Sequence, residues 1–194
     1  MVGLVILAMG GWLLIERTLS SAEPVSLEVP CSPVVLDRNG RLLRAFTVAD
    51  GRWRLPISRG EVDPLYLQML LGYEDRRFYA HSGVDIRALA RAAWQMLRHR
   101  RIVSGGSTLT MQVVRLRLGL ATGSFDDKWR QLIGALALER HVDKGRVLDA
   151  YLNLAPFGGN LEGVRAAALA WFGREPARLT PAQAALLVAL PQAP

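Results

Sequence analysis

The residues best suited to chemistry lie in the stretch GYEDRRFYAHSGVDIRAL, residues 72 to 89. Leucines just before it mark the buried stripe of a predicted helix: Leu67, Leu70 and Leu71. Residues three and four apart share one helix face, so the next position on this stripe is Glu74. A carboxyl group on an apolar face is partly desolvated, which penalises its charged form and raises the pKa of such a group. Glu74 is therefore a candidate general acid or base.

These residues alone also allow a second interpretation of Glu74. Gly72 can end the helix early, because glycine is a poor helix former. Glu74 would then face solvent or pair with Arg76 or Arg77, as most acidic side chains do.

A second chemical candidate is the stretch SGGSTLTMQVVRL, residues 104 to 116. Two glycines followed by Ser107 and Thr108 predict a loop that leads into a helix N-terminus with hydroxyl caps. Free backbone N–H groups and the helix dipole favour an anion such as phosphate there. The stretch is not a Walker A loop, because no lysine follows the second glycine. The alternative is an ordinary capped helix after a flexible loop.

Positive charge surrounds this loop in the sequence. The chain has 24 Lys and Arg against 17 Asp and Glu, a net charge of +7, which favours an anionic partner. The run RHRRIV at residues 98 to 103, with Arg115, Arg117 and Lys128, could hold a pyrophosphate or an acidic lipid head group. A solvated basic face is the alternative. No nucleic-acid-binding motif accompanies these charges, so we expect no nucleic-acid partner.

Cysteine and histidine usage argues against a metal enzyme. The single cysteine, Cys31, cannot form an internal disulfide or a cysteine-based metal site. The histidines His81, His99 and His141 share neither a helix face nor an HExxH spacing, so a zinc centre is not expected.

The elements that must position these groups are mostly helices. An uncharged stretch closed by Glu16 and Arg17 predicts a membrane anchor over residues 1–19, although it is shorter than a full span. Residues 20–58 read as a linker and a β-hairpin turning at Arg38-Asn39-Gly40. Helices are expected over the following ranges: 64–73 after an Asp63 cap, 85–98, 126–140, a segment capped by Asp143, 161 to Gly173, and 180 to before Pro191.

Together these stretches resemble the peptidoglycan glycosyltransferase domain, glycosyltransferase family 51, of class A penicillin-binding proteins and monofunctional transglycosylases. Four motifs carry the resemblance in order: EDRRFYAHSGVD, GGSTLTMQ, KGRVLDAYLN and GVRAAALAWFG. The details SGGSTLTMQ, APFGGNLEGV and LPQAP look most like the 1C branch of the class A proteins. The resemblance implies a mainly α, lysozyme-like, two-lobed domain over residues 59–194 that continues past Pro194. It lies on the outer, periplasmic face of the bacterial cytoplasmic membrane.

The resemblance also implies a reaction, in which lipid II is polymerised into glycan strands with inversion at the anomeric carbon. Glu74 matches the general base, which takes the proton of the acceptor GlcNAc 4-hydroxyl as it attacks C1 of the donor MurNAc. Undecaprenyl pyrophosphate leaves. Other motif positions match substrate-binding residues of the family: Asp75, Phe78, His81, Ser107, Thr108, Thr110, Gln112, Arg115, Lys128 and Asn153. Gly83 and Asp85 match the rest of the first motif.

One departure from the family concerns its second glutamate, in an RKxxE motif. This chain reads DKWRQ, so Lys128 is kept and Gln131 stands at the glutamate position. A carboxylate missing beside a leaving pyrophosphate weakens any neutralisation assisted by Mg²⁺ or Mn²⁺, and Lys128 and Arg115 then carry more of the charge. No metal ligand is assigned, and a divalent cation at the pyrophosphate is the only cofactor in question.

The expected partners are lipid II, the growing glycan strand, the membrane, and other cell-wall synthesis proteins. Moenomycin, a phosphoglycolipid inhibitor of the family, is expected to bind. A lysozyme-like glycan hydrolase is the runner-up function, which needs a second carboxylate. Its candidates are Asp85, Asp126 and Glu139. A catalytically weak scaffold that binds lipid II is a third possibility, suggested by Gln131.

Overall fold

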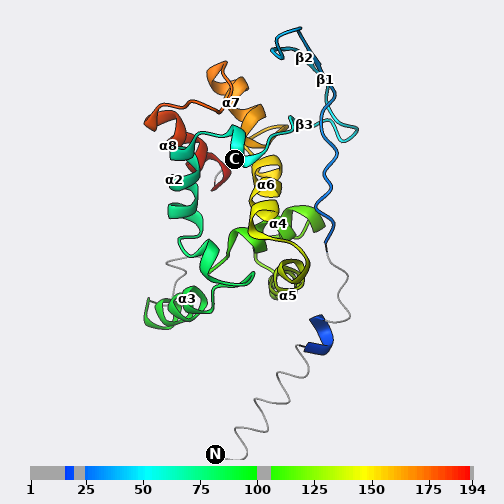
Figure 1. The fold of residues 1–194 in the computed structure, drawn as a ribbon. Helices are drawn as coiled ribbons and strands as arrows, with labels where there is room; N and C mark the ends of the chain where they lie inside the picture. The colour runs from blue at the N-terminus through cyan, green and yellow to red at the C-terminus, as the bar shows by residue number, and fades with distance from the viewer. Residues whose placement is uncertain (1–15, 20–24, 100–105, 193–194) are drawn as a thin grey trace, which may run out of the picture. The chain divides into compact units, whose positions relative to one another are not determined.

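The chain folds as two compact units (Figure 1), seen in a computed structural model that describes residues 16–19, 25–99 and 106–192. One unit takes in the described residues up to Ser26 together with Tyr79–Asp143. The other takes in Leu27–Phe78 and the described residues from Lys144 onward. Helices dominate both units, so the predicted mainly α class is confirmed. The predicted anchor falls mostly on residues outside the described ranges, and within those ranges no helix is long and apolar enough to cross a membrane.

The unit that contains Glu74 is built on four α-helices. They are α2 (Pro64–Glu74), α6 (Lys144–Leu154), α7 (Val164–Phe172) and α8 (Pro181–Ala189). Short 3₁₀ turns adjoin them: η1 (Arg59–Glu61), η2 (Phe78–Ala80), which crosses into the other unit, and η3 (Leu190–Gln192). Three predicted helix boundaries are confirmed. Asp63 caps α2 by accepting from the Leu65 N–H, Thr180 caps α8, and Gly173 ends α7 in the left-handed conformation.

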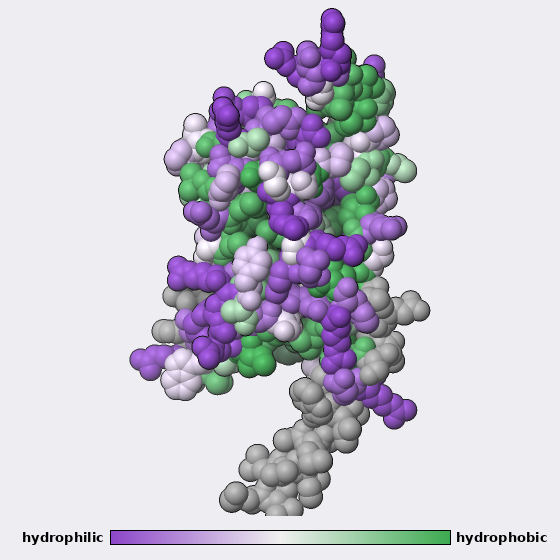
Figure 2. All heavy atoms as spheres, in the orientation of Figure 1, coloured by the Kyte–Doolittle hydropathy of each residue, from purple (hydrophilic) through white to green (hydrophobic). Residues whose placement is uncertain are grey.

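The predicted β-hairpin is present in the same unit. Strands β1 (Val34–Leu36) and β2 (Leu42–Ala45) pair antiparallel. The Asp37 carboxylate accepts hydrogen bonds from the N–H groups of Asn39 and Arg41, and Gly40 takes a positive φ of 78°. These local contacts fix the turn. Figure 2 shows hydrophobic surface gathered over this hairpin below a hydrophilic tip.

One predicted helix is too long at its start. Residues Leu161–Glu162 form strand β4, which pairs in parallel with β3 (Trp53–Arg54), and α7 begins only at Val164. Gly163, with φ of 83°, separates strand from helix. The pairing of Leu161 with Trp53 spans more than a hundred residues, so the helical pattern of the sequence could not reveal it.

Among its described residues, the second unit contains three longer helices, α3 (Ile86–His99), α4 (Leu109–Leu118) and α5 (Phe125–His141). Helices α4 and α5 pack against each other. Their contact face is apolar and fully buried at Leu109, Val113 and Leu138. Thr108 caps α4 as the sequence predicted, because its hydroxyl accepts from the Met111 N–H at 3.2 Å.

Gly83, in the first motif, joins three segments of this unit. The Thr108 hydroxyl donates to the Gly83 carbonyl at 2.5 Å, which ties the start of α4 to the first motif. A Cβ atom at Gly83 would lie 2.4 Å from the Ala135 carbonyl oxygen, inside the backbone of α5. Gly83 also has a φ of 85°, which side chains rarely adopt. Only glycine therefore fits where the first motif, α4 and α5 meet.

We predict that Gly83→Ala lowers the free energy of unfolding by more than about 2 kcal/mol, since it adds a backbone overlap to an unfavourable φ. Urea unfolding followed by circular dichroism measures the change. Gly119→Ala is the matched control in the same unit: Gly119 also has a positive φ, of 61°, but a Cβ atom added there would meet nothing within 4 Å. It should cost only about 1 kcal/mol. Equal losses of unfolding free energy in the two variants would contradict the claim that a side chain at Gly83 overlaps the backbone of α5.

Candidate active site

Glu74 is the last residue of α2, and its side chain is half-buried. The helix runs through Gly72, so the interpretation in which Gly72 ends the helix early is wrong. Of the predicted stripe only Leu70 is fully buried, with no exposed surface, whereas Leu67 and Leu71 are half-buried, and Tyr66 is the other fully buried residue of α2. Burial raises the pKa of the Tyr66 phenol, and the nearby negative charge of Glu74 raises it further. The carboxylate therefore stands at the end of a buried helix stripe, as the sequence predicted.

The amide of Gln192 binds this carboxylate. Its Nε2 donates a hydrogen bond to Glu74 Oε1. Gln192 lies in η3, directly after α8, and α8 packs along α2. No sequence signal pointed to Gln192 as a partner, because 118 residues separate the two side chains.

The other members of the first motif divide between the two units. Asp75 is buried and is the C-cap residue of α2, where its N–H donates to the Leu71 carbonyl. The Asp75 carbonyl accepts a hydrogen bond from the Phe78 N–H at 3.0 Å. Phe78 is 1% exposed, and its ring packs under the Lys144 ammonium at 4.5 Å from the ring centre. This cation–π contact and the burial make Phe78 a packing residue here. His81 is half-buried in the second unit.

A lysine centre lies at the start of α5 in the second unit. Lys128 Nζ donates to Ser107 Oγ at 2.5 Å and to Gln131 Oε1 at 3.4 Å. Burial lowers the pKa of Lys128, and the positive charge of Arg115 lowers it further. A cation that is partly desolvated, beside a second cation and with neutral partners, attracts an anion strongly. Ser107, Arg115, Lys128 and Gln131 thus form a candidate anion site, which we call the lysine site.

Two motif threonines hold helices together. Thr110 is fully buried on α4, and its hydroxyl donates to the Glu139 carboxylate of α5. Thr108 is used by the α4 cap and by Gly83. Gln112, one residue beyond the first turn of α4, is half-buried. The substrate-binding roles predicted for these three residues stay predictions, and the contacts described for both threonines lie within the chain.

The three candidate second carboxylates of a hydrolase are engaged inside the second unit. Asp85 is buried and caps α3 by accepting from the Ala88 N–H. Asp126 pairs with Arg130 on the surface of α5, and Glu139 binds Thr110. Nothing in these contacts favours a hydrolase.

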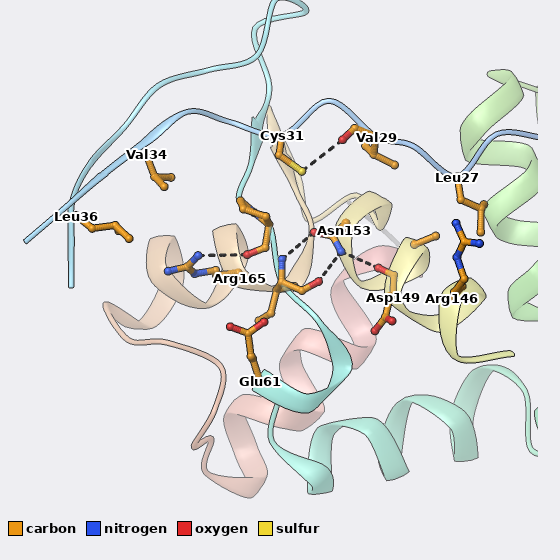
Figure 3. A pocket seen from close by; sticks show the side chains of 13 residues that line it. Leu27, Val29, Cys31, Val34, Leu36, Glu61, Arg146, Asp149, Asn153 and Arg165 are labelled. Carbon is orange, nitrogen blue, oxygen red and sulfur yellow. Dashed lines mark hydrogen bonds between the residues drawn. The ribbon is translucent and has the colours of Figure 1, made fainter. Parts of the chain in front are cut away.

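Asn153, the polar end of the KGRVLDAYLN motif, holds the backbone. Its Oδ1 accepts from the Ile57 N–H at 3.0 Å, and its Nδ2 donates to the carbonyls of Ile57 and Asp149, both at 2.7 Å (Figure 3). Both ends of the amide are therefore occupied by the main chain. The predicted contact of Asn153 with substrate stays a prediction, and the structure gives it a positioning role.

Asn153 also lines a pocket of about 600 Å³ in the Glu74 unit (Figure 3). Apolar side chains of residues 27 to 36 form one wall, including Leu27, Val29 and Leu36. The polar lining is already bound within the chain: Asp149 pairs with Arg59, and Arg165 pairs with Glu175. A ligand would have to compete with these contacts, so the pocket is not assigned as the site.

Comparison with known proteins identifies relatives of the chain. A family model described as Transglycosylase matches residues 39–194. Penicillin-binding protein 1C of Escherichia coli is 50% identical over 167 residues, 86% of this chain and 22% of the relative. Penicillin-binding protein 1A of Pseudomonas aeruginosa is 34% identical over 188 residues, 95% of the chain and 22% of the relative. The chain thus spans under a quarter of the length of these relatives.

We predict that Lys128→Met weakens binding of inorganic pyrophosphate about tenfold or more, the value of a hydrogen bond to a charged group. Titration calorimetry at fixed ionic strength measures the affinity. Because the folded chain lowers the pKa of Lys128, wild-type binding should also begin to weaken at a pH below the 10.5 of an ordinary lysine.

Arg130→Met is the matched control for this experiment. Arg130 is an exposed cation on the same helix, paired with Asp126, so its loss changes the net charge equally. Binding should change little. Equal losses for the two variants would mean that net charge, and not the lysine site, attracts the anion.

Proposed function

This chain belongs to the transglycosylase family, and on that premise we propose that it is a peptidoglycan glycosyltransferase that polymerises lipid II. The observation that carries the proposal is the half-buried Glu74 carboxylate at the end of α2, at the position of the family's general base. The acceptor is the GlcNAc 4-hydroxyl, and the donor is the MurNAc C1 linked to undecaprenyl pyrophosphate.

In the proposed step Glu74 removes the proton of the acceptor hydroxyl. The hydroxyl oxygen forms a bond to C1 of the donor as the bond from C1 to the pyrophosphate oxygen breaks, which inverts the anomeric centre. The proton rests on the Glu74 carboxylate and then passes to solvent. Because Glu74 ends α2 and its side chain is only half-buried, the carboxylate can be reached by an acceptor hydroxyl.

The lysine site is proposed to receive the pyrophosphate of the donor. Lys128 has three N–H donors, of which two are directed at Ser107 and Gln131 in the described contacts. Arg115 adds a second positive charge close enough to affect the pKa of Lys128. Fixed cations stabilise the negative charge that develops on a leaving pyrophosphate.

The residues around Lys128 do not fit a divalent cation. Mg²⁺ and Mn²⁺ prefer carboxylate oxygens, whereas Lys128 has a hydroxyl and a neutral amide as neighbours. Across the described part of the chain, no group of three or more acidic, histidine or cysteine side chains is arranged to hold a metal. In the proposed reaction, Lys128 and Arg115 therefore neutralise the charge on the pyrophosphate.

Helix α3 supports contact with a membrane, and we propose that this is the outer face of the bacterial cytoplasmic membrane. The helix is strongly amphipathic, but much of its apolar side is exposed: Ile86, Trp94 and Leu97 are 77%, 65% and 74% exposed. Arginines follow the neighbouring side of the helix, at Arg87, Arg91 and Arg98. An exposed apolar face beside arginines is typical of a helix that lies in the lipid interface. We propose that α3 dips into the membrane that carries lipid II.

The test of the function is incubation of the purified chain in detergent with labelled lipid II, with and without moenomycin. Glycan strands resolved on a gel that disappear with moenomycin would support the proposal. Folded protein that binds moenomycin but makes no strands would instead indicate a lipid II-binding scaffold.

We predict that Glu74→Gln abolishes strand formation while lipid II binding survives, since the amide keeps the shape of the carboxyl group but cannot accept the proton. Gel assays measure the rate, and fluorescence anisotropy measures lipid II binding. Glu175→Gln is the control, because Glu175 is an exposed carboxylate of the same unit that pairs with Arg165. Near wild-type polymerisation by Glu74→Gln would sink the assignment.

We also predict that Gln131→Glu makes the enzyme depend on a divalent cation. The new carboxylate would pair with Lys128 and withdraw it from the donor, so the metal-free rate should fall about tenfold. Magnesium should restore the rate, because a carboxylate at position 131 would help to hold a divalent cation that neutralises the pyrophosphate. Gln68→Glu, an exposed position on α2, adds the same charge elsewhere and controls for it. Indistinguishable magnesium titrations for wild type and Gln131→Glu would refute the role of this position.

A further inference from the structure

The contact between Gln192 and Glu74 was not predicted, although Gln192 belongs to the LPQAP stretch at residues 190–194. Gln192 Nε2 donates to Glu74 Oε1, so the amide directly touches the carboxylate proposed as the base. A carboxylate oxygen that accepts one N–H bond is held in place, and its rotation is restricted.

Gln192 is delivered by a well-anchored helix. α8 begins with a capping box, in which Thr180 and Gln183 bind each other's backbone N–H groups, and Pro181 occupies its first turn. Its inner face is buried at Ala184, Leu187 and Val188. The Leu190 N–H continues the helix by bonding to the Leu186 carbonyl. The amide of Gln192 is therefore positioned by packed structure and not by a free tail.

The helix pair α2 and α8 is joined at both ends. At the start of α2, the Asp63 carboxylate accepts from the Leu179 N–H at 2.8 Å, and the Asp63 N–H donates to the Pro176 carbonyl at 2.8 Å. At the end of α2, Gln192 binds Glu74. Since the two helices are tied near both ends of α2, the register between them is fixed, and so is the place of the amide relative to the carboxylate.

We propose that Gln192 is a positioning residue for the general base: its amide holds Glu74 Oε1 and so fixes the orientation of the carboxylate toward the acceptor hydroxyl. This inference rests on the proposed function of Glu74. A neutral amide suits the role, because it donates a hydrogen bond without supplying a competing charge. Orientation of a base within about 1 Å of its productive position is worth about two orders of magnitude in rate.

Gln192→Met tests the inference, since methionine has a similar length and shape but no N–H donor. We expect kcat for strand formation to fall about 10- to 100-fold, the value of one hydrogen bond to a charged group. KM for lipid II should stay within about threefold, because the amide acts through Glu74 and not on the substrate. Gln192→Asn, which keeps the amide on a shorter side chain, should recover part of the loss.

Gln68→Met is the matched control. Gln68 is an exposed glutamine on α2, in the same unit, and its replacement should leave kcat unchanged. Thermal unfolding of each variant checks the fold. A loss of kcat in Gln192→Met with unchanged melting temperature and KM supports positioning, whereas a wild-type kcat overturns it.

A measurement without turnover separates this inference from the proposed function. The side-chain amide resonance of Gln192 in a ¹⁵N–¹H spectrum should shift in Glu74→Gln, and the resonance of Gln68 should not. An unmoved Gln192 resonance overturns the contact even if strands form. If the Gln192 resonance shifts in Glu74→Gln but the wild-type chain makes no strands, the contact is confirmed. The catalytic role of Gln192 is then overturned together with the proposed function.

Discussion

The arrangement of the Glu74 unit depends on the packing of α2 against α8. The buried stripe of α2 ends in a carboxylate, and such a group stays at an apolar face only if the helix cannot rotate to expose it. Burial of Leu70 contributes about 1.5–3 kcal/mol to holding that face inward. Tyr66 shows what the packing overcomes: its hydroxyl is buried and has no hydrogen-bond partner among the described residues. The helix pair therefore keeps its register even where one polar group is left unsatisfied.

The second unit depends on a different constraint, which is that the Lys128 ammonium must stay available to bind an anion. Lys128 is partly desolvated beside Arg115, an arrangement that costs stability and favours a negatively charged ligand. The surrounding polar groups are fixed by contacts of their own: Thr108 with Gly83, and Thr110 with Glu139. These bonds tie the first motif to α4 and tie α4 to α5. The motif residues of this unit thus divide into a few that present charge and several that hold those few in place.

Local features were predicted well because their causes are local. Asp63 and Thr108 cap helices through their own side chains, and the hairpin turn at Asn39-Gly40 needs only the residues around it. Membership of a motif was less informative about the role of each residue. Asn153 and Thr110 match substrate-binding positions of the family, yet the contacts seen for them are to the backbone and to a neighbouring helix. A residue that touches substrate and one that supports it can occupy the same motif, because the reaction requires both.

The sequence by itself determined the helices, their caps, the candidate base Glu74 and the cation Lys128. Periodicity, capping and charge depend on residues that are close together in the chain, so they can be recognised without the fold. Only the tertiary structure decided that Gln192 binds Glu74, that Gly83 has no room for a side chain, and that the apolar side of α3 faces outward. Each of these depends on which segments meet across long stretches of chain. Amphipathic periodicity shows that a helix has an apolar side, but only the packing of its neighbours decides what that side contacts.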